Sequence, residues 1–145
     1  AVVTFGTTPT EIQNFLVDPG YGMQLHEHEV GLTQRFDNLQ TTLGGTLIYY
    51  WEAREEWYDR SGATPTQRTG GWINLSGTYA KNVPTSGVAG DPAEDTFSGY
   101  VPVGSIPHSP VRFRLMALGF VANSMVGDLK NSSYIEHFGN VIPGV

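Results

Sequence analysis

The stretch from Gly20 to Val30, GYGMQLHEHEV, holds the residue types and spacing in this chain that most suggest chemistry. His26 and His28 are separated by one residue, and each is followed by a glutamate. On a β-strand, residues two apart point to the same side, so both imidazoles could reach one metal ion while Glu27 and Glu29 face away. A metal site is therefore one interpretation of this segment.

The same segment resembles the opening of the first metal motif of the cupin family, a glycine followed after five residues by His-x-His. Cupins are jelly-roll barrels, and the resemblance implies a metal-dependent enzyme that uses His26 and His28. Cupins also carry a glutamate four or five residues further on, where this chain has Leu32 and Thr33. Two histidines are too few, because zinc takes about four ligands and non-haem iron takes about three from protein. We expect no metal or cofactor here and interpret the segment as a hydrated strand face or edge.

Other candidate catalytic groups lack a common arrangement. Glu52 and Glu56 would suit glycoside hydrolysis, which needs two carboxyl groups about 5 to 10 Å apart, but no sequence feature places them in one cleft. Ser109 follows His108 in a proline-rich segment, and the chain has no G-x-S-x-G motif. We therefore predict a protein that is not an enzyme.

The composition excludes several classes of function. The chain of 145 residues has no cysteine, which excludes disulfides, zinc–thiolate sites and thiol nucleophiles. Its 14 acidic residues outnumber 8 basic ones, so it lacks the cationic surface that nucleic-acid binding requires. No apolar run approaches the roughly 20 residues of a membrane helix. We predict neither a nucleic-acid partner nor membrane insertion.

Segments rich in β-branched and aromatic residues recur about eight times along the chain, each bounded by turn-forming residues. We expect strands at Val2–Phe5, Ile12–Val17, Met23–Phe36, Thr46–Tyr58, Trp72–Tyr79, Thr96–Val103, Val111–Val121 and Tyr134–Val141. A single helical turn is the alternative at Thr8–Phe15 or at Asp128–Ser132. The 18 glycines and 9 prolines, with only 15% charged residues, fit short strands and many turns.

Alternation predicts which side chains are buried. In PVRFRLMALGFV one face carries Val111, Phe113, Leu115, Ala117 and Val121, which we assign to the core.

The segment TLIYYWEAREEWYDR is ambiguous, because EAREE also suits a helix. Its three consecutive aromatics and its flanking glycines favour a strand. One face of that strand would carry Leu47, Tyr49, Trp51, Ala53, Glu55 and Trp57.

About eight strands in a chain of this length predict a single domain over residues 1–145, an antiparallel β-sandwich of jelly-roll or related Greek-key topology. An immunoglobulin-like sandwich is the lesser alternative, since it usually needs about 100 residues and seven strands. Ala1 leads directly into an apolar run, so we expect the chain to be cut from a longer one. The segments expected as surface loops are Asp59–Gly71, Lys81–Asp95 and Val103–Ser109.

The runs TLIYYWEAREEWYDR and PVRFRLMALGF, with a tail ending NVIPGV, resemble the protruding (spike) domain of a nodavirus-like small RNA virus capsid protein. The resemblance implies a domain on the virion surface that self-associates as a dimer or trimer and meets a host receptor or glycan through its loop tips. A phage tail-fibre receptor-binding tip shares these features and is the alternative in the same class. The cupin-like enzyme using His26 and His28 is the alternative in a different class.

Aromatic and charged side chains near the expected loops are the candidate contact residues. Tryptophan is enriched at protein interfaces, but large aromatics also fill sandwich cores, so core packing, subunit contact and a glycan platform remain competing interpretations. We predict partner or glycan contacts from Trp51, Trp57, Trp72, Arg68, Asp91 and His108.

Overall fold

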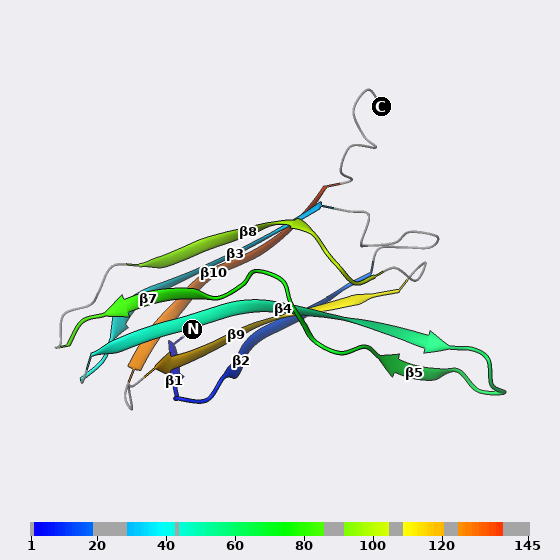
Figure 1. Cartoon of the computed structure of the whole chain (residues 1–145), viewed down its shortest axis with the longest axis horizontal. Helices are drawn as coiled ribbons and strands as arrows, with labels where there is room; N and C mark the ends of the chain where they lie inside the picture. Colours follow the sequence, from blue (N-terminus) through cyan, green and yellow to red (C-terminus); the bar gives the residue numbers. More distant parts are fainter. Residues whose placement is uncertain are drawn as a thin grey trace, which may run out of the picture.

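The chain folds into two antiparallel β-sheets packed face to face (Figure 1). The computed structural model describes these ranges of residues: 2–18, 29–42, 44–85, 92–104, 109–120 and 125–137. The strands within them are β1 (Val2–Phe5), β2 (Thr10–Val17), β3 (Glu29–Gln40), β4 (Gly45–Asp59), β5 (Thr66–Thr69), β6 (Ile73–Asn74), β7 (Tyr79–Val83), β8 (Ala93–Tyr100), β9 (Val111–Phe120) and β10 (Met125–His137). The prediction of an all-β sandwich is confirmed.

Within the described ranges the chain has no helix, and hence none that is long and apolar enough to cross a membrane. The helical alternatives were wrong, because Thr10–Phe15 lies in β2 and Asp128–Ser132 lies in β10, where the backbone pairs with neighbouring strands.

One sheet has the strand order β1-β10-β3-β8, and the other has the order β2-β9-β4. Three short strands share the free edge of β4: β7 pairs with its start, β6 with its middle and β5 with its end. The expected strand Trp72–Tyr79 was therefore wrong in its extent, because a turn around Gly77, which has a φ of 70°, separates β6 from β7.

Two expected loops contain strand residues. Lys81–Asp95 was predicted as one loop, but Lys81–Val83 ends β7 and Ala93–Asp95 begins β8. Val83 and Ala93 are both buried, a contribution to the core that the surrounding turn-forming residues conceal in the sequence. Asp59–Gly71 was also predicted as a loop, yet Thr66–Thr69 pairs with the end of β4 through backbone groups that any sequence can supply.

The inward faces of the central strands form the core. On β9, Val111, Phe113, Leu115 and Ala117 are buried as predicted, and Val121 lies outside the described residues. On β4 the predicted face is buried at Leu47, Tyr49, Trp51 and Ala53.

Polar bonds between the two layers accompany the apolar packing. Trp51 of β4 donates its Nε1–H to Oε1 of the fully buried Gln34 of β3, at 2.6 Å. Tyr49 of β4 donates its hydroxyl to the carboxylate of Asp95 of β8. Both bonds join β4 to the opposite sheet, so they fix the relative position of the two layers as well as satisfying polar groups.

The end of β4 leaves the sandwich. β9 begins at Val111, opposite Glu55, so among the described strands Trp57–Asp59 pairs with β5 alone. This is why Glu55 and Trp57, predicted on the buried face, are only half-buried. Residues 56–69 form a two-stranded hairpin that extends past the other strands (Figure 1), and we call it the arm.

Candidate recognition surface

The three tryptophans do not form one platform. Trp51 has no exposed surface and lies in the core, so its predicted role as a contact residue was wrong for the folded chain. Its place in the alternation with Leu47, Tyr49 and Ala53 explains this burial. Trp57 lies on the arm, whereas Trp72 lies just before β6 and contacts arginines of the neighbouring strands.

The arm brings together two of the predicted contact residues. Trp57 of β4 lies directly opposite Arg68 of β5, so both side chains project from the same face. Arg68 Nε also lies 3.5 Å from Oδ2 of Asp59, the next residue of β4 on that face. Tyr58 projects from the other face and is 58% exposed. Every residue from 60 to 69 is exposed, so neither face of the arm is covered by another layer of the described chain.

The other two contact residues, His108 and Asp91, lie outside the described residues, but their flanking segments lie at opposite ends of the sandwich. Gly104, which precedes the His108 segment, donates its backbone N–H to the Glu55 carboxylate at the arm's base. Val83, which precedes the Asp91 segment, pairs with the first residue of β4. Gly104 therefore lies at the same end of the sandwich as the arm, and Val83 lies at the other end.

His26 and His28 also lie outside the described residues, and the prediction about them stays a prediction. Among the residues that the structure describes, no three His, Cys, Asp or Glu side chains come together as metal ligands do.

Backbone bonds attach the base of the arm to the sandwich. The N–H of Glu56 donates to the carbonyl of Pro110, at 2.9 Å, just before β9 begins. The N–H of Gly70 donates to the carbonyl of Glu55, also at 2.9 Å, just after β5 ends. The arm is thus fixed at its root and unsupported further out.

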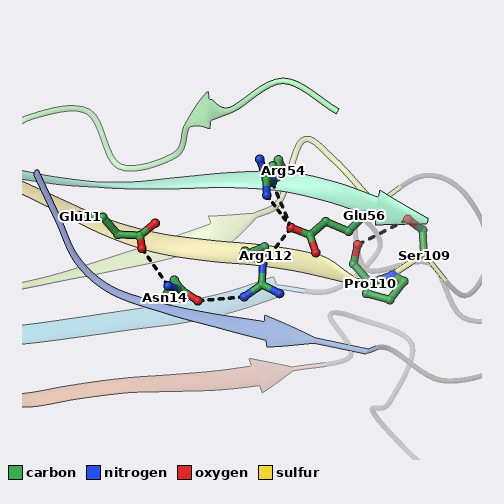
Figure 2. A network of polar contacts seen from close by, with 7 residues as sticks. All are labelled: Glu11, Asn14, Arg54, Glu56, Ser109, Pro110 and Arg112. Atoms are coloured by element: carbon green, nitrogen blue, oxygen red, sulfur yellow. Dashed lines mark hydrogen bonds and ion pairs between the residues drawn. The ribbon is translucent and has the colours of Figure 1, made fainter. Parts of the chain in front are cut away.

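A charged network covers the outer face of the sheet next to this root (Figure 2). Arg54 of β4 and Arg112 of β9 lie directly opposite each other, an arrangement in which like charges repel. Glu56 lies on the same face, and its Oε2 accepts from Arg54 Nε at 3.0 Å and from Arg112 Nε at 2.8 Å. Arg112 also donates from Nη1 to Asn14 of β2, which itself donates to Glu11.

The carboxylate of Glu56 is only 5% exposed, and its environment acts on its pKa in two directions. Burial raises the pKa, because it disfavours the charged form, while the hydrogen bonds and charges of Arg112 and Arg54 lower it. The arginines prevail, and the pKa of Glu56 lies below its ordinary value. Glu56 is therefore an ionised group that compensates two guanidinium groups.

A second ion pair continues the network along β4 and β9. Arg114 lies opposite Glu52 and donates to its Oε1 from Nε at 2.9 Å, with Nη2 at 2.7 Å. The ring of Trp72 then spans two arginines: its centroid is 3.9 Å from Cζ of Arg114 and 4.5 Å from Cζ of Arg54, both distances typical of cation–π contact. We call Arg54, Arg112, Arg114 and Trp72, with the acceptors Glu52 and Glu56, the arginine–tryptophan cluster.

The sequence carried a signal for this cluster that strand periodicity could have revealed. In a strand, the alternate residues of EAREE place Glu52, Arg54 and Glu56 on one face. Arg112 and Arg114 project from one face of β9 in the same way, and the two charge patterns are complementary across an antiparallel pair. The pairing of β4 with β9 was the missing information. The structure also shows that Glu52 and Glu56 are arginine partners, not an acid and base facing a cleft.

No family model matches this chain, and no curated protein and no solved structure shows significant similarity to it.

Proposed function

We propose that this chain is a non-enzymatic structural and recognition module, the surface-exposed protruding domain of a viral capsid protein. In this role the domain associates with further copies of itself on the virion and provides a surface for a host receptor or glycan.

The strand order supports a jelly-roll topology for the domain. With β5 and β6 set aside as additions, eight strands remain, and they pair first with last: β1 with β10, β2 with β9, β3 with β8 and β4 with β7. A long antiparallel hairpin rolled into two sheets has this pairing. Jelly rolls build viral capsid and lectin domains and also cupins, so the topology supports a class of protein by analogy, and the function depends on the surface.

The arm is the observation that carries the proposal. A two-stranded hairpin without a covering layer is marginally stable in water. The arm nevertheless presents Trp57 on one face and Tyr58 on the other, and every residue from 60 to 69 is exposed. Aromatic side chains held on an uncovered hairpin are suited to burial against a partner. A second and a third copy of the chain would supply that partner in a capsid protrusion.

Solution mass as a function of concentration tests the proposal. We expect the chain to form a dimer or trimer whose population rises with concentration, as measured by sedimentation velocity or light scattering. Replacing both arm aromatics, Trp57→Ser with Tyr58→Ser, should shift the chain to monomer. The association constant should fall by more than about tenfold, because an aromatic residue that is a hot spot of an interface contributes about 2 kcal/mol or more.

Phe120→Ser is the matched control, because Phe120 is 56% exposed and lies at the opposite end of β4's sheet from the arm. It should leave the mass distribution unchanged. A wild-type chain that stays monomeric at about 1 mM, a concentration well above the micromolar range of ordinary specific complexes, would contradict self-association. An equal loss of association in the Phe120→Ser variant would show that association does not depend specifically on the arm.

A further inference from the structure

We propose that the arginine–tryptophan cluster is a binding site for a carboxylated sugar, with the guanidinium groups holding the carboxylate and Trp72 packing against the ring. This proposal extends the attachment part of the proposed function, but it concerns the outer face of the sheet and not the arm.

Each arginine of the cluster keeps N–H donors that no described residue of the chain accepts. Arg54 donates to Glu56 from Nε and Nη2, and Arg114 donates to Glu52 from the same two atoms, so their Nη1 groups have no protein acceptor in the described part of the chain. Arg112 donates from Nε and Nη1, and its Nη2 has no acceptor among the residues that the structure describes. These guanidinium side chains are 22–28% exposed, so a ligand can reach them.

The guanidinium groups are held before any ligand arrives. Glu56 fixes Arg54 and Arg112, Glu52 fixes Arg114, and the Trp72 ring restrains two of the three from another side. Long arginine side chains normally lose rotamer entropy when they bind a ligand, and here much of that loss has already occurred on folding. Planar guanidinium groups with free N–H donors match the two oxygens of a carboxylate.

The dimensions of the cluster suit a single sugar ring. Adjacent strands lie about 4.8 Å apart, and residues two apart along a strand lie about 6.7 Å apart. The arginines occupy one such cell between β4 and β9, with Arg54 opposite Arg112 and Arg114 two residues further along. A hexose ring of similar width can therefore place its carboxylate at the arginines and an apolar face toward Trp72.

The cluster carries a local positive charge that favours binding of an anion, although the chain as a whole is negative. The formal net charge is -6 and the chain has only 8 lysines and arginines, yet three of these lie in this cluster. Glu52 and Glu56 compensate two of the three, which leaves one positive charge at the site. Glu11 is the nearest further acidic residue in the network, and Asn14 separates it from Arg112.

A matched pair of ligands tests the proposal. Methyl β-glucuronide and methyl β-glucoside differ only in a carboxylate against a hydroxymethyl group. We would titrate each into the ¹⁵N-labelled chain and follow the three indole N–H signals, assigning the Trp72 signal with Trp72→Phe. The glucuronide should shift the Trp72 signal with a millimolar dissociation constant, as expected for one charged ring with a few hydrogen bonds, and the glucoside should not.

Arg114→Gln should weaken glucuronide binding about tenfold or more, a loss of about 1.4 kcal/mol. Arg35→Gln is the control, because Arg35 lies in the other sheet with its own acidic partners, Asp37 and Glu94. Circular dichroism checks that both variants keep the fold. No shift with up to about 50 mM glucuronide, well above a millimolar dissociation constant, would overturn the proposal. Equal shifts with the glucoside, or equal weakening in the Arg35 variant, would overturn it as well.

One further outcome distinguishes a related idea. If a hexapeptide of glutamates shifts the Trp72 signal and the glucuronide does not, the cluster recognises an acidic protein segment and the sugar proposal is wrong. The titration is run at a concentration where the chain is monomeric. Failure of sugar binding therefore leaves the association experiment on the arm unaffected, and the reverse also holds.

Discussion

At the scale of single residues, Glu56 shows how one carboxylate can decide the arrangement of a whole sheet face. The β4–β9 register forces Arg54 and Arg112 to face each other, and without a shared acceptor these charges would push the two strands apart. Glu56 is positioned to accept from both because it follows Arg54 by two residues in an extended strand. The primary role of Glu56 is therefore to pair with both arginines, and its burial follows from that pairing.

Glu56→Gln should destabilise the fold. The glutamine keeps the shape and one acceptor oxygen but loses the charge that compensates two arginines. We expect a loss of about 1–2 kcal/mol in the free energy of unfolding. The loss is smaller than for a fully buried ion pair, because both guanidinium groups are partly hydrated. Urea unfolding followed by fluorescence measures it. Glu94→Gln, an exposed carboxylate 3.8 Å from Arg35, should change stability by less than about 0.5 kcal/mol.

The difference in stability between wild type and Glu56→Gln should depend on pH. The folded pKa of Glu56 lies below its unfolded value of about 4.3, so its contribution is present above that pH and is lost as pH falls through the folded pKa. The stability difference between wild type and Glu56→Gln should be constant near neutral pH and shrink below about pH 4. A difference that persists undiminished in acid would show that shape, not charge, accounts for the effect.

At the scale of elements, the sequence predicted strands with buried residues better than strands that are exposed throughout. Aromatic and β-branched alternation placed β1, β4 and β9 within a residue or two of their observed bounds, because their inward residues are buried. β5, with the sequence TQRT, is exposed throughout, so it carries no apolar alternation and was predicted as loop. Strands defined by backbone pairing alone cannot be recognised from hydrophobic periodicity.

β4 also carries the polar bonds that position one sheet against the other. Tyr49→Phe removes the hydroxyl that donates to Asp95 and leaves a half-buried carboxylate without that donor. We expect a loss of about 1–3 kcal/mol in the free energy of unfolding, measured in urea. Tyr58→Phe, on the uncovered arm, is the control and should be neutral.

An alkaline titration provides an independent readout of Tyr49. Burial first, and then the Asp95 carboxylate, raise the pKa of Tyr49 above its ordinary value. The stability that its protonated hydroxyl contributes is present below the unfolded pKa of about 10 and is lost as pH rises through the higher folded pKa. In ultraviolet titration this tyrosine should therefore ionise only when the chain unfolds. Burial also raises the pKa of Tyr50 and of Tyr79, so the Phe variant should lose the contribution of one tyrosine to that late step. An unchanged amplitude of the late step in the variant would refute the assignment.

At the scale of the whole molecule, the sandwich class could be predicted and its surface could not. Strand number and length indicate two layers, but which strands neighbour each other depends on contacts far apart in sequence. The arginine–tryptophan cluster needed β4, β9 and the segment before β6 to meet, and Arg54, Arg114 and Trp72 are spread over 60 residues of chain. Trp51 illustrates the reverse error. Its residue type suggested contact with a partner, but the packing of the two sheets buries it.

The arm and the sandwich should behave as separable parts, because the backbone bonds that join the arm to the body lie at its root in the part of the chain that the structure describes. Replacing residues 58–67 by Asn-Gly would join Trp57 to Arg68 through a two-residue hairpin turn and keep the observed pairing of those residues. The free energy of unfolding should change by less than about 1 kcal/mol, since the deleted residues bury little apolar surface. Association should weaken strongly in the same protein. Thermal unfolding and sedimentation measured side by side check this, and a large loss of stability in the monomer would mean that the arm supports the core and is not free to engage a partner.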